Sequence, residues 1–410
     1  MNRPPSPAAA ATAAHASLAF LVLAGALTTF PPVTTDIYLP ALPQLTRALH
    51  ATTAQGQQTL ATYFLGLGTG QLVYGPWADR VGRRPVMLFG AALYLVATLG
   101  CWLTTSIQWM VALRFVQAIG ACSGVVISSA IVRDRFGHQE SARIFSILMT
   151  ARGFGPLIAP VVGGVIVTFL GWRAIFAALG VFGASILAWV FLGLKETRTA
   201  AVAERAKTES PVRAYLQVLR RPVILGYALT NGLNFAGMFA WIAAAPYLII
   251  GVYKVPALWF GWIFGINAAG FMIASQINRR LLRRLPADRI MTFGALGAAL
   301  AAVVLAVDAF AGLGGPWGVM VPLFFVVSSL GFVSTNAMAG GLAVDPARAG
   351  SVSALLGTAQ FAFAGLVSAG AGLISHDPAI AMAGAVLACA LGATVFPVIR
   401  LLRTRTSNRS

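Results

Sequence analysis

Long apolar stretches separated by short polar segments run through most of the chain. A helix needs about 20 residues to cross a hydrocarbon layer about 30 Å thick, and apolar stretches of that length recur along the whole sequence. We therefore predict an all-α integral membrane protein with twelve transmembrane helices. The predicted spans are residues 18–43, 55–77, 86–105, 108–132, 144–170, 173–194, 222–249, 257–278, 289–311, 316–340, 349–374 and 378–400.

The longest polar segment divides the chain near its midpoint. It covers residues 195–221 and holds seven basic and three acidic residues, which is typical of a linker outside the membrane. The loop 279–289 (RRLLRRLPADR) also takes the same relative place in the second half as the loop 79–84 (DRVGRR) takes in the first. We predict two six-helix bundles with short tails. The predicted division is a tail at 1–16, a bundle at 17–194, the linker at 195–221, a bundle at 222–401 and a tail at 402–410.

The N-terminal stretch is rich in Ala and Pro, and the apolar run that follows it could be taken for a signal peptide. That run continues well beyond the 7 to 15 residues of a signal core. We expect a retained first helix instead.

The composition agrees with a protein that has lipid as its solvent. Hydrophobic residues make up 58% of the chain and charged residues only 10%, whereas soluble domains carry roughly a quarter charged residues. The net charge of +18 is compatible with nucleic-acid binding, but the basic residues stand in short clusters between apolar spans. With the N-terminus inside, 24 of the 29 Lys and Arg residues fall in the tails and inner loops, with Arg289 and Arg400 counted there because they end their spans on the inner side. This asymmetry predicts that both termini are cytoplasmic, and no nucleic-acid partner is expected.

The cysteines and histidines show no spacing typical of a metal site or a catalytic nucleophile. The three cysteines, Cys101, Cys122 and Cys389, lie far apart inside apolar spans, and the histidines fall near span ends. The sequence has no GxxxxGK[ST] phosphate loop. An enzyme in the membrane would need a paired acid and base or a metal cluster, so we expect neither an enzyme nor a metal, and no cofactor apart from a proton gradient.

The loop between the second and third predicted spans, Gly75 to Pro85, has the sequence GPWADRVGRRP. Glycines permit tight backbone turns, the aspartate can accept hydrogen bonds from arginines or a helix N-terminus, and the arginines hold the loop inside. The motif residues are Gly75, Asp79, Arg80, Gly82, Arg83 and Arg84. A loop that only sets orientation is the alternative. The motif resembles the signature loop of the major facilitator superfamily.

Other motifs narrow this resemblance. They are LRFVQAIG at 113–120, GPLIAPVVGG at 155–164, TDIYLPALP at 35–43 and GWRAIF at 171–176. Together they are similar to the bicyclomycin and chloramphenicol resistance (Bcr/CflA) branch of drug:proton antiporters. The resemblance implies two pseudo-symmetric six-helix bundles that rock about a central site. It also implies export of drug-like molecules across the bacterial inner membrane in exchange for protons, which would confer drug resistance.

The Gly/Pro motif also has a mechanical interpretation. Its prolines remove backbone donors and its glycines let a neighbouring helix approach closely, which would bend the fifth span near a gate. The motif residues are Gly155, Pro156, Pro160, Gly163 and Gly164, and Ala159 departs slightly from the family pattern. Ordinary small-residue packing is the alternative.

Asp36 is the one carboxylate predicted deep in the membrane, in a span that we expect Pro31 and Pro32 to interrupt. An ionised aspartate there costs roughly 2.5 to 3.5 kcal/mol, so it is expected to face a wet cavity or a cation. Arg114, in the fourth span, is predicted at a similar depth. We hypothesise that the two interact in one state and that protonation of Asp36 releases it. A purely structural salt bridge is the alternative.

Polar and aromatic residues repeat at helical spacing on the predicted seventh and tenth spans. Tyr227, Asn231, Asn234, Met238 and Trp241 share one helix face, as do Phe325, Ser329, Phe332 and Asn336. In the superfamily these spans line the central cavity, together with spans one and four. The predicted substrate-binding residues are Tyr38, Arg152, Asn231, Asn234, Met238, Trp241, Phe332, Asn336 and Gln360, and Asn267 is a further candidate. Helix-to-helix packing is the alternative for each.

The sequence therefore predicts a proton-coupled exporter of amphipathic small molecules, expected to be monomeric in the bilayer. A proton symporter or a uniporter for a small metabolite is the alternative, because it would share the fold and Asp36. The direction of flux driven by a pH gradient distinguishes them.

Overall fold

The computed structural model describes residues 18–208, 210–312, 314–370 and 377–407. The predicted N-terminal tail lies outside these residues. The helices of the first half are α1 (Leu18–Asp36), the 3-10 turn η2 (Leu39–Ala41), α2 (Leu42–Ala48), α3 (Thr53–Val81), α4 (Arg83–Leu103), α5 (Ile107–Arg135), α6 (His138–Leu170) and α7 (Trp172–Gly193).

The second half follows a linker that contains two short helices, α8 (Ala200–Thr208) and α9 (Pro211–Leu219). The later elements are α10 (Pro222–Pro246), the π-helical η3 (Tyr247–Val252), α11 (Ala257–Leu281), α12 (Ala287–Ala311), α13 (Gly315–Val344), η4 (Pro346–Arg348), α14 (Ala349–Gly370) and α15 (Pro378–Ser407).

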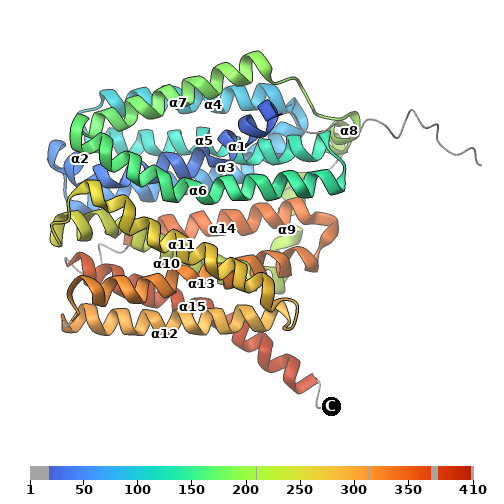
Figure 1. The fold of residues 1–410 in the computed structure, drawn as a ribbon. Helices are drawn as coiled ribbons and strands as arrows, with labels where there is room; N and C mark the ends of the chain where they lie inside the picture. Colours follow the sequence, from blue (N-terminus) through green and yellow to red (C-terminus); the bar gives the residue numbers. More distant parts are fainter. Residues whose placement is uncertain (1–17, 209, 313, 371–376, 408–410) are drawn as a thin grey trace, which may run out of the picture.

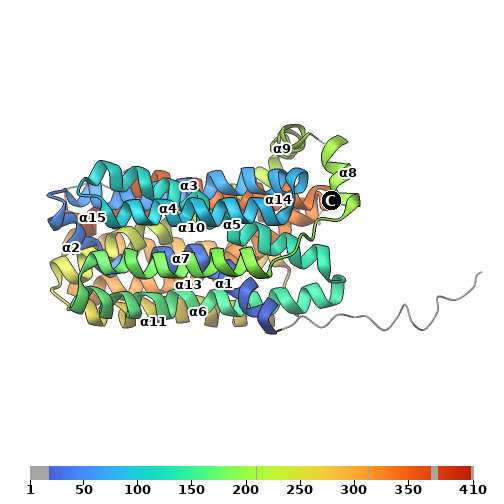
Figure 2. The same ribbon diagram turned by 90° about the horizontal axis from the view of Figure 1, so that it is seen from above.

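Helices α1 to α7 form one layer of the molecule and α10 to α15 the other, with all the long helices nearly parallel (Figure 1). The linker helices α8 and α9 lie at one end, and α2 lies at the other end in both views (Figure 2). We call these the linker end and the distal end. Large apolar side chains such as Leu192 (82% exposed) and Trp317 (76% exposed) point outward, as expected for a surface that meets lipid.

The predicted count of twelve spans corresponds to twelve long helical units among the described residues. Eleven of them are long and apolar enough to cross a membrane, with α1 to α2 counted as one unit, Leu18–Ala48. The remaining unit is α3, which has 29 residues but carries several glutamines and glycines. Helix α3 packs against α5 and α14, so much of its length is covered by neighbouring helices.

The expected interruption at Pro31 and Pro32 is wrong. Helix α1 runs through both prolines and ends at Asp36, where a turn leads into η2. Each proline lacks a backbone N–H, so the carbonyl one turn earlier has no helical hydrogen-bond donor. Neighbouring helices cover this region. Gly124 of α5 packs directly on the Leu27 carbonyl, and the Tyr63 hydroxyl donates to the Pro31 carbonyl at 3.2 Å.

Candidate functional site

Asp36 lies just beyond the middle of the α1 to α2 unit and is 5% exposed. Its carboxylate has no hydrogen bond or ion pair with the described residues, although the group is buried. Neither oxygen is among the fully enclosed polar atoms that lack a partner, so the carboxylate keeps some accessible surface. An unpaired acid in this setting is available to bind a proton or a cation.

Arg114 lies in the core of the first layer and is fully buried. Its guanidinium carbon lies 4.5 Å from the ring centre of Tyr38 and 4.2 Å from that of Tyr63. One terminal nitrogen donates to Gln117 at 2.6 Å, whereas Nε and Nη2 have no partner. Gln117 in turn donates to Thr98 at 2.7 Å. The cation is therefore held mainly by aromatic faces and a chain of neutral polar groups.

No ion pair joins Asp36 to Arg114 in this conformation of the described residues. Thr34 and Tyr38 point into the core of the first layer, where Thr34 bonds Tyr94 and Tyr38 covers Arg114. Asp36 is two residues after Thr34, about 200° around α1, so it lies on the opposite face of that helix from Thr34. The predicted interaction would need a different conformation and stays a hypothesis.

Arg152 of α6 is half-buried and has no hydrogen-bond or ion-pair partner among the described residues. Arg152 lies closer to the linker end than Asp36 does. Gly155, one turn after Arg152 on α6, packs against Pro32 of α1, which itself precedes Asp36 by one turn. Its charge therefore remains available to a ligand or to water.

The polar stripe predicted on the seventh span corresponds to α10, and much of it packs against α13 of the same layer. Asn231 accepts from Ser334 at 2.5 Å, and Asn234 donates to Ser329 at 3.2 Å. The other polar atom of each amide, Nδ2 of Asn231 and Oδ1 of Asn234, is buried without a partner. The same holds for Trp241 Nε1, so this stripe retains unused hydrogen-bonding capacity.

The remaining predicted substrate residues are dispersed. Asn336 donates to Asn278 at 2.8 Å and to the Phe332 carbonyl, and Phe332 packs on Gly294 of α12. Met238 and Gln360 are half-buried. The candidate Asn267 keeps a buried oxygen without a partner.

Tyr227, which begins the α10 stripe, belongs to a different cluster near the linker end. Its hydroxyl donates to Asp288 at 2.8 Å, and Asp288 pairs with Arg400 at 2.7 Å. Helical spacing groups Tyr227 with the other residues of the stripe but could not show that α12 and α15 meet α10 at Tyr227. The acidic residue in the basic loop 279–289 was the signal that could have revealed this cluster.

The signature loop is held by a partly buried charge network. Arg83, which is 4% exposed, pairs with Asp79 at 2.5 Å and with Asp134 of α5 at 2.8 Å. Gly82 adopts φ +123° between α3 and α4, so a glycine is required at that turn. Gly75 makes no turn, because α3 continues as a helix to Val81. The expected turn at Gly75 is therefore wrong.

A residue that sequence reasoning missed, Glu196, caps α4. Its carboxylate accepts from the backbone N–H groups of Arg83 at 2.9 Å and Arg84 at 3.1 Å, and from those of Thr197 and Arg198. Burial acts to raise the pKa of Glu196, but the four N–H donors outweigh it and hold the pKa below its usual value. Only the position of Glu196 just after the sixth predicted span hinted at this role.

Other arginines of the loop also tie it to its surroundings. Arg84 donates to the Phe191 carbonyl at 2.9 Å and Arg80 to the Ala206 carbonyl at 3.5 Å. Arg198 returns from the linker to the carbonyls of Asp79 and Arg80. The loop and the start of the linker therefore form one unit.

The Gly/Pro segment of α6 forms a seam between the two layers near the distal end. A Cβ at Gly164 would lie 2.5 Å from the Ala257 carbonyl oxygen of α11, and Gly261 of α11 packs on the backbone of Pro160 and Val161. Gly163 packs in the same way on the Ile37 carbonyl, next to Asp36. Pro156 lies in the same helix, half-buried. Helix α6 thus contacts both the turn that follows α1 and the opposite layer.

A second contact joins the layers at the distal end. The hydroxyls of Thr46, in α2, and Tyr247, in η3, lie 2.8 Å apart. At the linker end the Tyr215 hydroxyl of α9 donates to the Leu72 carbonyl at 3.3 Å.

No group of three or more His, Cys, Asp or Glu residues that could hold a metal ion occurs in the part of the chain that the structure describes. The site keeps one unpaired carboxylate, the unpaired Arg152, two unpaired nitrogens of Arg114 and single unpaired atoms of several amides, which suit protons and polar organic molecules.

Two layers of membrane-spanning helices, a glycine seam between them and unpaired charges inside define a membrane transporter. The family model described as Major Facilitator Superfamily matches residues 16–369, and the chain belongs to this superfamily. It is therefore a transporter and not an enzyme.

Curated relatives agree with the resemblance found in the motifs. The chain is 30% identical to a bicyclomycin resistance protein homolog of Haemophilus influenzae over 370 residues, which cover 90% of this chain and 93% of the relative. It is 34% identical to a chloramphenicol resistance protein of Pseudomonas aeruginosa over 326 residues, 78% of this chain and 75% of the relative. The predicted membership of this branch is confirmed.

Solved structures confirm the predicted fold. The structure of a D-xylose-proton symporter superposes with a TM-score of 0.72 over 92% of this chain and 97% of that chain, at 14% sequence identity. At that identity the likeness shows the fold alone.

Proposed function

We propose that this protein exports drug-like small molecules across the bacterial inner membrane in exchange for protons. The relatives named for bicyclomycin and chloramphenicol resistance support the class of substrate. Asp36 carries the coupling: it is an unpaired, nearly buried carboxylate with accessible oxygens beside the glycine seam. Each proton that enters gains about 2.3 kcal/mol per 100 mV, so no nucleotide is needed.

We place the linker end in the cytoplasm, with both termini inside, because the basic residues concentrate in the loops of that end. The contacts at the distal end, between Gly164 and Ala257 and between Thr46 and Tyr247, then close the outer side. On this assignment the outer side is closed by these contacts, and Asp36 has no ion pair with Arg114 in this conformation of the described residues.

The substrate would contact groups whose hydrogen-bonding capacity the protein leaves unused. Arg152 and the unpaired amide and indole atoms of α10 are the leading candidates. The other predicted contacts, Tyr38, Met238, Phe332, Asn336 and Gln360, remain candidates at lower priority, because Tyr38 covers Arg114, Asn336 is hydrogen-bonded and Phe332 packs on α12.

Transport in proteoliposomes tests the proposal. With chloramphenicol as the probe and an inside-acidic pH gradient, the wild type should accumulate the drug and release protons, whereas a symporter would move drug and protons in the same direction. Asp36→Asn should abolish pH-driven uptake while drug exchange without a gradient persists. An Asp36→Asn variant that retains a normal pH dependence would refute the coupling role.

Asp308→Asn serves as the matched control. Asp308 lies near the distal end of α12 and accepts from the backbone N–H of Gly314 at 2.7 Å, away from the seam. The Asp308→Asn variant should therefore transport the drug with an unchanged pH profile.

A further inference from the structure

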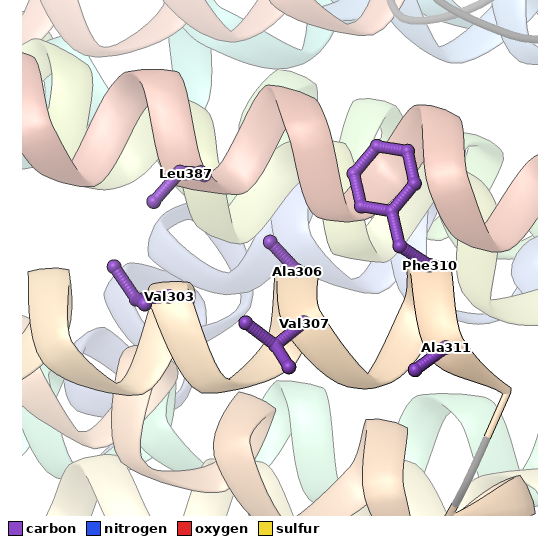
Figure 3. Close-up of a pocket in the computed structure, with 6 residues that line it drawn as sticks. All are labelled: Val303, Ala306, Val307, Phe310, Ala311 and Leu387. Atoms are coloured by element: carbon purple, nitrogen blue, oxygen red, sulfur yellow. The ribbon is translucent and has the colours of Figure 1, made fainter.

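Helix α12 borders two apolar grooves of similar size. One holds about 550 Å³ between α12 and α15, and the close-up shows its lining side chains, five from α12 and Leu387 from α15 (Figure 3). The other holds about 600 Å³ and is formed by α12, α13 and the end of α11. The two grooves differ in their charged surroundings.

The α12–α13 groove faces the lipid and is long enough for an acyl chain. Its lining includes Phe293, Leu300 and Phe325, which are 58%, 68% and 57% exposed on the outer surface. It extends along α12 from Ile290 to Val304, about 21 Å at 1.5 Å per residue. One leaflet of the hydrocarbon layer is about 15 Å thick, so the groove accommodates a chain from that leaflet.

The linker end of this groove is strongly basic. Leu281, Leu285 and Ile290 line it there, in the turn between α11 and α12. The surrounding exposed arginines are Arg279, Arg280, Arg283, Arg284 and Arg289. None of their side chains has an ion-pair or hydrogen-bond partner among the described residues. A cluster of unpaired arginines beside an apolar groove attracts the headgroup of an anionic lipid.

The α12–α15 groove provides the internal comparison. Val307 and Ala311 line it, and the nearest charged residue on α12 is Asp308 in the same turn. An anionic headgroup would be repelled there. Both grooves offer apolar space, but only the α12–α13 groove has arginines beside it that would bind an anionic headgroup.

We propose that the α12–α13 groove binds one anionic phospholipid, with an acyl chain between Phe293 and Phe325 and the phosphate on the arginines of residues 279–289. The site needs only that the chain spans a membrane and does not depend on which substrate it carries.

Native mass spectrometry of the full chain in detergent, with equimolar phosphatidylglycerol and phosphatidylcholine of the same acyl chains, tests this site. The wild type should retain one phosphatidylglycerol with at least a tenfold preference. Replacing Arg283 and Arg284 together (R283Q/R284Q) should lower this preference at least tenfold, because each arginine contributes about fivefold. Gly297→Leu should displace the lipid, because a Cβ at Gly297 meets nothing within 4 Å and the new side chain would fill the groove.

Two matched controls should keep the lipid. The pair R213Q/R220Q removes two exposed arginines of the linker, and Ala311→Leu fills the other groove. Excess inorganic phosphate should also leave the lipid in place, because the groove holds the acyl chain. The charge variant alters only exposed side chains, so it tests the proposal even if Gly297→Leu does not fold. Equal retention of both lipids by the wild type, equal loss in variants and controls, or displacement by phosphate alone would each overturn the proposal.

Discussion

Arg114 has its charge between two tyrosine rings, with two nitrogens unpaired in a fully buried position. A buried charge without a counter-ion is unfavourable for stability, so its presence points to a functional requirement. Arg83 presents the opposite case, because its charge is matched by Asp79 and Asp134. The two arginines should therefore respond differently to the same substitution.

Arg114→Met should leave the thermal unfolding temperature unchanged or raise it, while transport is lost. Arg83→Met should lower the free energy of unfolding by about 3 kcal/mol, because it leaves the carboxylate of Asp134 buried without its partner. Thermal unfolding in detergent, together with proteoliposome transport, measures both effects. A large loss of stability in Arg114→Met would mean that the cation is structural.

At the scale of single elements, Glu196 joins the end of the sixth span to the start of α4. Its depressed pKa means that the carboxylate cap stabilises the folded state above its ordinary value of 4.5, and that this contribution disappears as the pH falls through the lower folded value. The cap should therefore be intact at neutral pH and weaken only in acid.

Hydrogen exchange at the first turn of α4, corrected for the intrinsic effect of pH, measures this cap. We expect Glu196→Ala to speed exchange several-fold at pH 7 and to abolish the additional acceleration that the wild type shows near pH 4. Glu204→Gln is the control, since Glu204 pairs only with Lys207 in an exposed position at 3.1 Å. Equal protection in Glu196→Ala and the wild type would exclude a capping role.

The glycine seam between α6 and α11 allows a direct test of the outer closure. A methyl group at Gly164 would press on the Ala257 carbonyl, and overpacking of this kind costs about 1–3 kcal/mol. Gly164→Ala should shift the conformational equilibrium about 5- to 150-fold towards a state open at the distal end. Spin labels on Arg47→Cys and Lys254→Cys, both exposed at that end, report the separation.

Gly153→Ala is the matched control for this seam, because its Cβ would meet only the Met272 sulfur at 3.9 Å. Identical distance distributions for the two variants would show that the seam does not hold the layers together.

At the scale of the whole molecule, the sequence predicted the spans well because apolar length reflects transfer into lipid, a property of each segment alone. The prediction of residues 222–249 lies close to α10 and η3, for example. Which residues of other helices a given helix face contacts depends on how the helices pack, and the periodicity of one helix does not reveal this. Helical spacing put Tyr227 and Asn231 on one face but could not show that Asp288 and Ser334 meet that face. The sequence likewise predicts Asp36 and Arg114 at a similar depth, but it could not show whether the two side chains pair.

The orientation of the whole molecule can be tested with a membrane-impermeant maleimide. The three native cysteines are buried, so they should give little background. A cysteine at Arg213 in the linker should react only after permeabilisation, and one at Lys254 should react in intact spheroplasts. The reverse pattern would overturn the positive-inside assignment.

The hydrogen bond between Thr46 and Tyr247 spans 201 positions of the chain. A chain that ends before residue 247 contains the whole first layer but lacks this contact with the second. The two layers can therefore be joined at this point only once the chain has been made as far as Tyr247.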